Sequence, residues 1–144
     1  MFDGLDHTVQ ALFIAPRDLI KWADRIRPHV IKMADGSGGR YESGDIFAAI
    51  ARAELLLWIA IDGPEIACVM LTEIVKYPRL RAMRCVGIVG SRPRRWMHLL
   101  AQVEDASRKT FGCTRFEALY PRALGRLLRT SGWREWHVLS EKSL

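Results

Sequence analysis

The stretch CVGIVGSRPRRWMHLL, Cys85 to Leu100, joins an apolar run to an amphipathic segment through a turn with three arginines. Apolar residues recur at helical spacing from Trp96 onward, so a strand is expected to feed a helix here. The first N–H groups of a helix have no partner within the helix and can bind phosphate. The turn is therefore either a phosphate site or a plain strand-to-helix connection with a charged rim.

The segments before this stretch predict one short strand, two helices and a meander. We expect a strand at 11–15 and a helix from Pro16 to about Gly36, which Pro28 breaks or kinks. A glycine-rich loop then precedes a helix at 45–54, capped by Ser43 or Asp45. Three strands of an antiparallel meander follow, at 55–61, 65–77 and 80–90.

The segments after the turn alternate between helix and strand. A helix is expected at about 94–111, a strand at 114–120, a helix at 121–132 and a last strand at 133–140. The strand ending near Val89 and the strand beginning near Thr114 should be parallel neighbours. The predicted fold class is α+β, a single domain over 1–144 with helices on both faces of a mixed sheet.

Composition excludes several classes of function. The chain has 144 residues, enough for one domain with its own core, and no apolar run approaches the length of a membrane span. Three cysteines in apolar surroundings predict buried free thiols in a reducing compartment. The histidines have no metal-ligand spacing, and neither a phosphate-binding GxxxxGK[ST] loop nor a hydrolase triad is recognisable.

The charge is concentrated in one part of the chain. The segment from Arg79 to Arg134 holds thirteen Lys or Arg and three acids, a net +10, whereas the whole chain carries +6. Such a segment suits cofactor phosphates, nucleic acid or an acidic protein surface.

The element order and loop lengths resemble those of the GCN5-related N-acetyltransferase (GNAT) superfamily over essentially the whole chain. The resemblance is most specific in RCVGIVGSRPRRWMHLLAQVEDASRKTFGC, which looks like the acyl-CoA motif, and in RALGRLLRTSGW, which looks like the last helix. The overall style is similar to small divergent GNAT-like proteins of bacteriophages, some of which are virion components.

The resemblance implies an acetyl-CoA site at the turn, but the glycine pattern of the family is altered. Pro93, Arg94 and Arg95 stand where glycines let the pyrophosphate approach, and proline removes one N–H donor. Arginine side chains would then have to hold the phosphates. The residues that would bind the cofactor are Val89, Gly90, Arg92, Arg94 and Arg95.

The catalytic residues of the family are matched only in part. The family's tyrosine acid falls at Leu128, which has no proton to donate, and Tyr120 is the nearby substitute. Glu73 and Glu117 are candidate general bases, since a carboxylate in an apolar cleft can take up a proton near neutral pH. Trp133 is expected in the core.

The sequence and the resemblance together predict two alternative functions. The first is a GNAT-like phage protein with a degraded acyl-CoA site and no cofactor, acting through a basic patch as a structural or interaction component, for example of a virion. The alternative is an N-acyltransferase that uses acetyl-CoA. The patch, with other protein subunits or nucleic acid as partners, comprises Arg92, Arg94, Arg95, Arg122, Arg126 and Arg129. The expected location is a virion or the cytoplasm.

Overall fold

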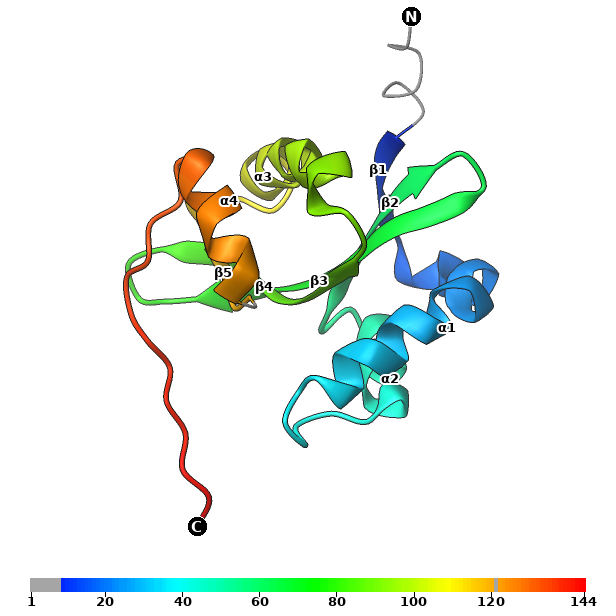
Figure 1. The fold of residues 1–144 in the computed structure, drawn as a ribbon, viewed down its shortest axis with the longest axis horizontal. Coiled ribbons are helices and arrows are strands. Elements are labelled where there is room, and N and C mark those ends of the chain that lie inside the picture. Colours follow the sequence, from blue (N-terminus) through cyan, green and yellow to red (C-terminus); the bar gives the residue numbers. More distant parts are fainter. Residues whose placement is uncertain (1–8, 121) are drawn as a thin grey trace, which may run out of the picture.

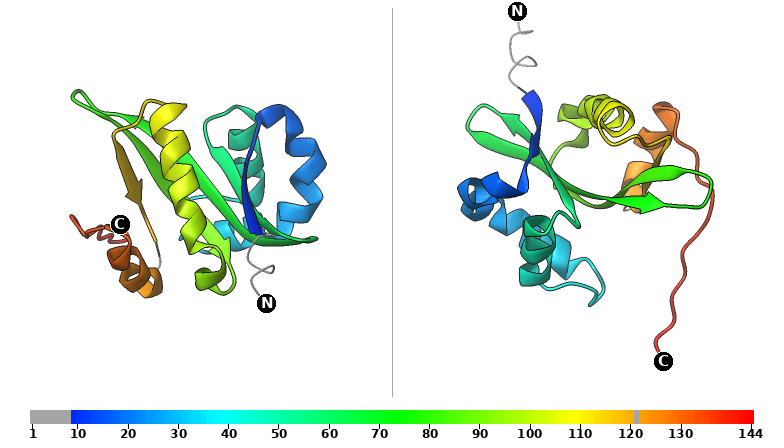
Figure 2. Two further views of the ribbon diagram at one scale, coloured as in Figure 1. Left: turned by 90° about the horizontal axis from the view of Figure 1, so that it is seen from above. Right: turned by 180° about the vertical axis from the view of Figure 1, so that it is seen from behind.

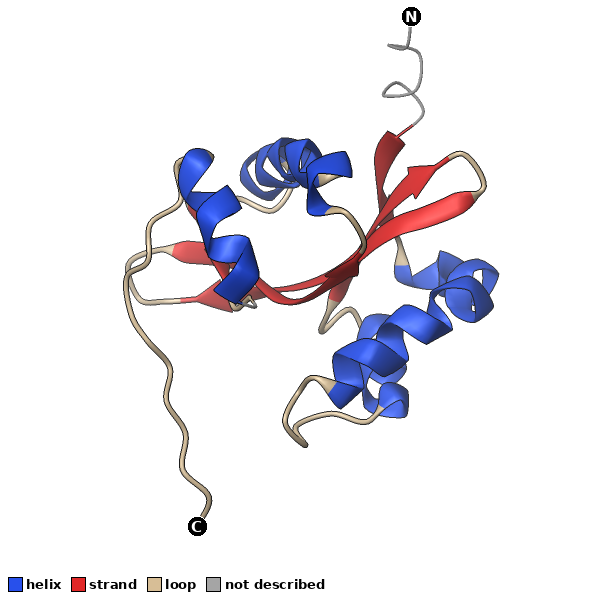
Figure 3. Ribbon diagram, viewed as in Figure 1, coloured by secondary structure: helices blue, strands red, loops and turns tan. Residues whose placement is uncertain are grey.

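The computed structural model describes residues 9–120 and 122–144, which form an α+β domain on a five-stranded sheet (Figure 1, Figure 3). The strands lie across the sheet in chain order: β1 (Val9–Ile14), β2 (Leu56–Asp62), β3 (Glu65–Lys76), β4 (Arg81–Gly90) and β5 (Arg115–Ala118). β1 to β4 are antiparallel and β5 is parallel to β4. The expected meander with a parallel strand pair is therefore confirmed.

Helices cover both faces of the sheet (Figure 2). α1 (Leu19–Asp35) and α2 (Ser43–Ala51) lie on one face, and α3 (Leu100–Lys109) and α4 (Gly125–Thr130) lie on the other. Short 3-10 turns precede three of these helices: η2 (Pro16–Asp18), η3 (Pro93–Arg95), η4 (Met97–Leu99) and η5 (Arg122–Leu124).

Alternation along the strands divides the core between the two faces, because successive side chains of a strand point in opposite directions. On the α1 side, Leu57 and Val69 pack with Ile26 of α1. On the α3 side, Met83 packs with Val103. Both strand faces are therefore buried where helices cover them.

A bulge in β4 ends the contact between β4 and β5. Leu71 pairs with Gly87 and Thr72 with Cys85, so Val86 is an extra residue in β4. The parallel pairing stops at Cys85 and Ala118, whereas β4 continues to Gly90. The two strands thus part just beyond the bulge.

Two expectations about elements are wrong, and one alternative of a third is excluded. Pro28 does not break α1, because it lies on the exposed side, where water can satisfy the carbonyl that loses its bond. The helix predicted from Arg94 is regular only from Leu100, since two 3-10 turns precede it. Residues 133–140 form no strand, and the C-terminal segment runs away from the sheet (Figure 1).

The cap of α2 also differs from the expectation. Glu42 is the N-cap, and its N–H donates to the Asp45 carboxylate at 2.9 Å, forming a capping box. Asp45 therefore takes part in capping α2 from the third position of the helix and not as its N-cap residue.

Candidate functional site

The turn after β4 is tighter than a helix N-terminus that binds phosphate. Arg92 adopts a left-handed conformation with φ 50°, and Trp96 has φ −131°, outside helical geometry. The N–H of Arg95 donates to the Arg92 carbonyl at 2.8 Å, and that of Trp96 donates to the Pro93 carbonyl at 3.1 Å. Two N–H donors of the turn are therefore already bonded to carbonyls of the same turn, and Pro93 has no N–H group to offer a phosphate.

Gly90 is required for packing. A Cβ at this position would lie 2.6 Å from the Ala67 carbonyl oxygen and 3.0 Å from Trp96 Nε1. The Trp96 indole is buried and donates to the Ser91 carbonyl at 3.1 Å. Val89, beside it, is half-buried in β4. The glycine thus lets the indole lie against the strand, which accounts for it without a ligand.

Arg95 is occupied by two acids of the β2–β3 hairpin. Its Nε donates to Asp62 at 2.6 Å, and its terminal nitrogen donates to Glu65 at 3.1 Å. The hydrogen bonds that Arg95 donates to Glu65 and Asp62 raise the pKa of its guanidinium above the ordinary value. Arg95 therefore fastens the turn to the hairpin. Arg92 and Arg94 are exposed and make no ion pair in the described part of the chain.

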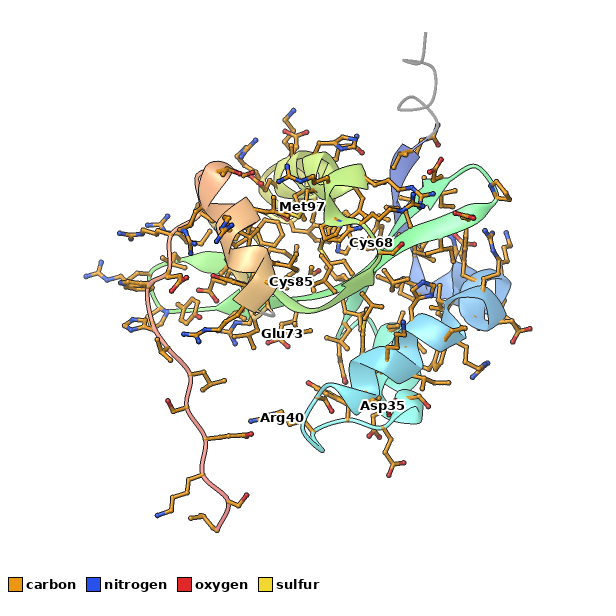
Figure 4. The ribbon with its side chains drawn as sticks, viewed as in Figure 1. Asp35, Arg40, Cys68, Glu73, Cys85 and Met97 are labelled. Atoms are coloured by element: carbon orange, nitrogen blue, oxygen red, sulfur yellow. The ribbon has the colours of Figure 1, made fainter. Side chains whose placement is uncertain are left out.

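The cavity between the sheet and the helices α3 and α4 is small and apolar. Its volume is about 20 Å³, which is room for about one water molecule. Cys85 and Met97 lie in this layer between the sheet and the helices (Figure 4). The lining residues are Met70, Cys85, Ile88, Met97, Leu100, Phe116, Ala118, Tyr120, Leu124, Leu128 and Trp133.

Tyr120 is the one wall residue of this cavity with a hydroxyl group, and it is half-buried. Leu128, at the position of the family's tyrosine, is 4% exposed and belongs to the core. Trp133 packs on Phe116 with ring centroids 5.0 Å apart, as expected of a core residue. Burial raises the pKa of the Cys85 thiol to about 12, so this wall offers no thiolate at neutral pH.

The two candidate bases lie on the opposite face of the sheet, on either side of Arg84. Glu73 pairs with Arg84 and Arg84 with Glu117 in the registers of three adjacent strands. Arg84 Nε donates to Glu117 at 3.0 Å, and an Arg84 nitrogen lies 3.7 Å from Glu73. The Tyr77 hydroxyl lies 3.1 Å from each Glu117 oxygen.

The sequence singled out both carboxylates but not Arg84, which contacts both of them, or Tyr77, which contacts Glu117. Arg84 lies on the same sheet face as the two carboxylates, a relation that follows from the strand register and not from a local pattern. The lone pairs of Glu117 that face its neighbours are occupied by donors. The arrangement of these side chains is therefore that of a structural ion-pair cluster.

The arginines of the last helices differ in their partners. Arg122 and Arg126 are exposed and make no ion pair among residues 9–120 and 122–144. Arg129 pairs with Glu135 at 3.0 Å. Within the same described ranges no group of histidine, cysteine and acidic side chains has the arrangement of a metal site, and no helix is long and apolar enough to span a membrane.

Comparison with known proteins identifies the fold through structure alone. No protein-family model matches the chain, and neither does any curated protein. The structure is similar to an aminoglycoside acetyltransferase, meta-AAC0020, from an uncultured soil metagenomic sample in complex with sisomicin. In that comparison the TM-score is 0.70 at 11% identity, covering 97% of this chain and 99% of that one.

Two further structures agree with this result. A ribosomal-protein-alanine N-acetyltransferase from Brucella melitensis biovar Abortus 2308 gives a TM-score of 0.63 at 13% identity, with 94% and 99% coverage. A GCN5-related N-acetyltransferase from Ralstonia eutropha JMP134 gives 0.64 at 11% identity, with 94% and 98% coverage. Together with the parallel β4–β5 pair and the bulge at Val86, these similarities show that the chain has the GNAT fold.

Proposed function

We propose that this protein is an acyl-CoA-dependent N-acyltransferase that receives the acyl arm where β4 and β5 part. The observation that carries the proposal is the loss of β5 pairing beyond Cys85 while β4 continues to Gly90. Beyond the bulge, the edge of β4 away from β3 has no partner strand in the described part of the chain, and Ile88 of this stretch lines the cavity between the sheet and the helices. An acylated pantetheine arm, with its two amide groups, is suited to bond to such an edge as a strand would.

The cavity must widen for this arm to enter. Its volume of about 20 Å³ admits little more than a water molecule. Met97 is the wall residue best suited to move, because methionine has three rotatable bonds and adapts to irregular space. Entry of the arm is therefore expected to displace Met97 from the layer in which Figure 4 shows it.

The phosphates would be held by Arg92 and Arg94. Both side chains are exposed at the turn and have no acidic partner in the described residues, in contrast to Arg95. Guanidinium groups bind phosphate oxygens in pairs of hydrogen bonds. This side-chain grip replaces the backbone donors that Pro93 and the 3-10 turn remove.

The chemistry assigned to the site is transfer of an acyl group to an amine. The amine nitrogen attacks the thioester carbonyl carbon, a C–N bond forms, and the C–S bond breaks. The CoA sulfur takes a proton from the Tyr120 hydroxyl, the amine loses its proton to water, and the Tyr120 phenolate regains a proton from water, which restores the free enzyme. Because Glu117 is held by Arg84 and Tyr77, neither step is routed through it.

Calorimetry with acetyl-CoA tests the proposal. The wild-type protein should bind acetyl-CoA. The double variant Arg92→Ala with Arg94→Ala should raise Kd about 100-fold or more, since each charge-assisted bond contributes roughly 1.5–3 kcal/mol. The control is Arg108→Ala with Arg115→Ala, which removes the same charge away from the turn. Tyr120→Phe should lower kcat about 100-fold or more with Kd unchanged. If the wild-type protein does not bind acetyl-CoA at millimolar concentration, the proposed acyltransferase activity is wrong.

A second candidate is a non-catalytic GNAT-like component, for example of a phage virion, that binds partners through its basic surface. It is favoured by the buried Leu128 in place of the catalytic tyrosine and by the unpaired Arg122 and Arg126. Arg122→Glu with Arg126→Glu should then abolish binding to an acidic protein or a phosphate backbone with an unchanged Tm. Unchanged binding at moderate salt argues against it.

A further inference from the structure

The edge of β3 that faces β2 is left open over its last residues. β2 begins at Leu56, which pairs with Thr72, whereas β3 continues to Lys76. Residues 73–76 are therefore paired with β4 alone. At about 3.3 Å per residue, this open edge is about 13 Å long.

The chain that precedes β2 turns away from this edge. Ala53 has φ 60°, and the N–H groups of Glu54 and Leu55 both donate to the carbonyl of Ala49 in α2, at 2.9 and 3.2 Å. These residues thus complete the end of α2 and do not extend β2. The position next to residues 73–76 in the sheet is left without a strand.

The direction of the backbone groups follows from the hairpin that joins β3 to β4. The N–H of Tyr77 donates to the Leu80 carbonyl at 2.8 Å, so the backbone of Tyr77 faces β4. Alternate residues of a strand direct their N–H and C=O groups to the same side. The groups of Val75 therefore also face β4, and those of Ile74 and Lys76 face the open edge, where the described chain supplies no partner.

A groove of about 500 Å³ lies along this edge, within the size range of ligand sites. Its lining residues are Ala53, Glu54, Leu56, Glu73, Ile74, Val75, Lys76 and Arg84. The apolar ones among them are Leu56 of β2, Ile74 and Val75 of β3, and Ala53 of the turn after α2, so the groove offers both an apolar wall and backbone donors.

Lys76 is the feature of the groove that favours an acidic group at its end. Glu54 accepts two hydrogen bonds from Arg52, at 2.9 and 3.0 Å, whereas Glu73 shares Arg84 with Glu117. Lys76 is exposed, has no ion-pair partner in the described ranges, and by strand alternation lies on the same sheet face as Ile74, opposite to that of Glu73. An acidic group of a ligand is therefore expected at the Lys76 ammonium group, on the side away from Glu73.

We propose that the groove binds an extended peptide of a partner protein, which adds to β3 as a strand in the place that β2 leaves. The backbone groups of Ile74 and Lys76 pair with the peptide, and an acidic side chain or the C-terminal carboxylate of the peptide contacts the Lys76 ammonium. The peptide's side chains alternate, one set toward Ile74 and the other toward Glu73 and Arg84. The site is independent of the acyl-CoA proposal.

Selection of seven-residue peptides from a random library on the immobilised full chain tests this proposal. Two variants separate backbone pairing from charge. Lys76→Pro removes an N–H that makes no internal bond and so should keep the fold, as proline does on open edges. Lys76→Ala removes the charge and keeps the N–H. Lys109→Ala, an exposed lysine at the end of α3, is the matched control.

The expected result is a set of acidic peptides without central proline that bind the wild type and the control equally. Their affinity should fall about tenfold on Lys76→Ala and below detection on Lys76→Pro, with both variants folded. In the wild type, the selected peptide should slow amide exchange at Ile74 and Lys76, a readout that stands even if Lys76→Pro is unstable.

Three results overturn the proposal: no acidic peptide is selected, selected peptides bind Lys76→Pro as tightly as wild type, or amide exchange at Ile74 and Lys76 is unchanged by peptide. Lys76 would then serve only as a charge that protects an open edge from aggregation.

Discussion

Arg84 donates a 3.0 Å hydrogen bond from Nε to the Glu117 carboxylate, and the two residues are register partners in the parallel strands β4 and β5. Glu73 lies on the other side of Arg84, in the register of β3. One guanidinium therefore compensates two carboxylates on a sheet face. The side chains are each about a third exposed, so solvent screens the interaction only in part.

Arg84→Met should lower the free energy of unfolding by about 1–2 kcal/mol, because both carboxylates lose their charged partner at a half-buried position. Arg84→Lys keeps the charge without the planar fork and should cost less. Urea unfolding at neutral pH measures both. A methionine variant as stable as the wild type would show that the network contributes nothing to folding.

His29 should make stability depend on pH below neutrality. Burial, and then the nearby Lys32, lower the pKa of His29 from its ordinary value of 6.5, and its Nδ1 is buried without a hydrogen-bond partner among residues 9–120 and 122–144. The unfolded chain thus binds the proton more tightly, so stability is complete above about pH 6.5 and falls as the pH drops below it.

His29→Gln should reduce this loss of stability between pH 7 and 5, measured by urea midpoints at each pH. His98→Gln, on an exposed position of η4, should keep the wild-type slope. Equal slopes in the wild type and the His29 variant contradict the assignment.

Ala53→Gly should stabilise the protein by about 0.5–1 kcal/mol. Ala53 follows α2 with φ 60°, a left-handed conformation that suits glycine and strains residues with a Cβ. Thermal unfolding measures the gain. Ala48→Gly, inside α2, should instead cost about 1 kcal/mol, and a loss of stability at both positions would refute the strain at Ala53.

The three thiols should be unreactive in the folded protein. Cys68, Cys85 and Cys113 are all buried, and burial raises the pKa of Cys68 and of Cys85. A thiol-specific chromogenic reagent at pH 8 should label all three in denaturant and none under native conditions. Labelling of any thiol faster than global unfolding would reveal local opening at that strand or helix end.

Local patterns of the sequence were sufficient for most elements. Strand alternation in 55–90 and helical spacing after Leu100 predicted the meander and α3, because side-chain period follows backbone geometry. The parallel placement of β5 followed from the element order. Neither result needed knowledge of a contact between distant residues.

The failures have causes that lie beyond the local sequence. Residues 133–140 have strand-like composition, yet a strand exists only where a neighbour pairs with it, and that neighbour is not encoded locally. Pro28 was expected to break or kink a helix, and its exposed position in the tertiary structure allows α1 to continue without a break.

Composition and periodicity by themselves thus determined the α+β class, the meander and the basic character of the β4–α3 turn. Only the tertiary structure decided what the charges do. Arg95 lies 33 residues from Asp62 in the chain and bonds to it, whereas Arg92 and Arg94 in the same turn make no ion pair with any residue that the structure describes. Ion pairs depend on atoms within a few ångströms, and such distances are set by strand register and packing between elements that no local pattern specifies.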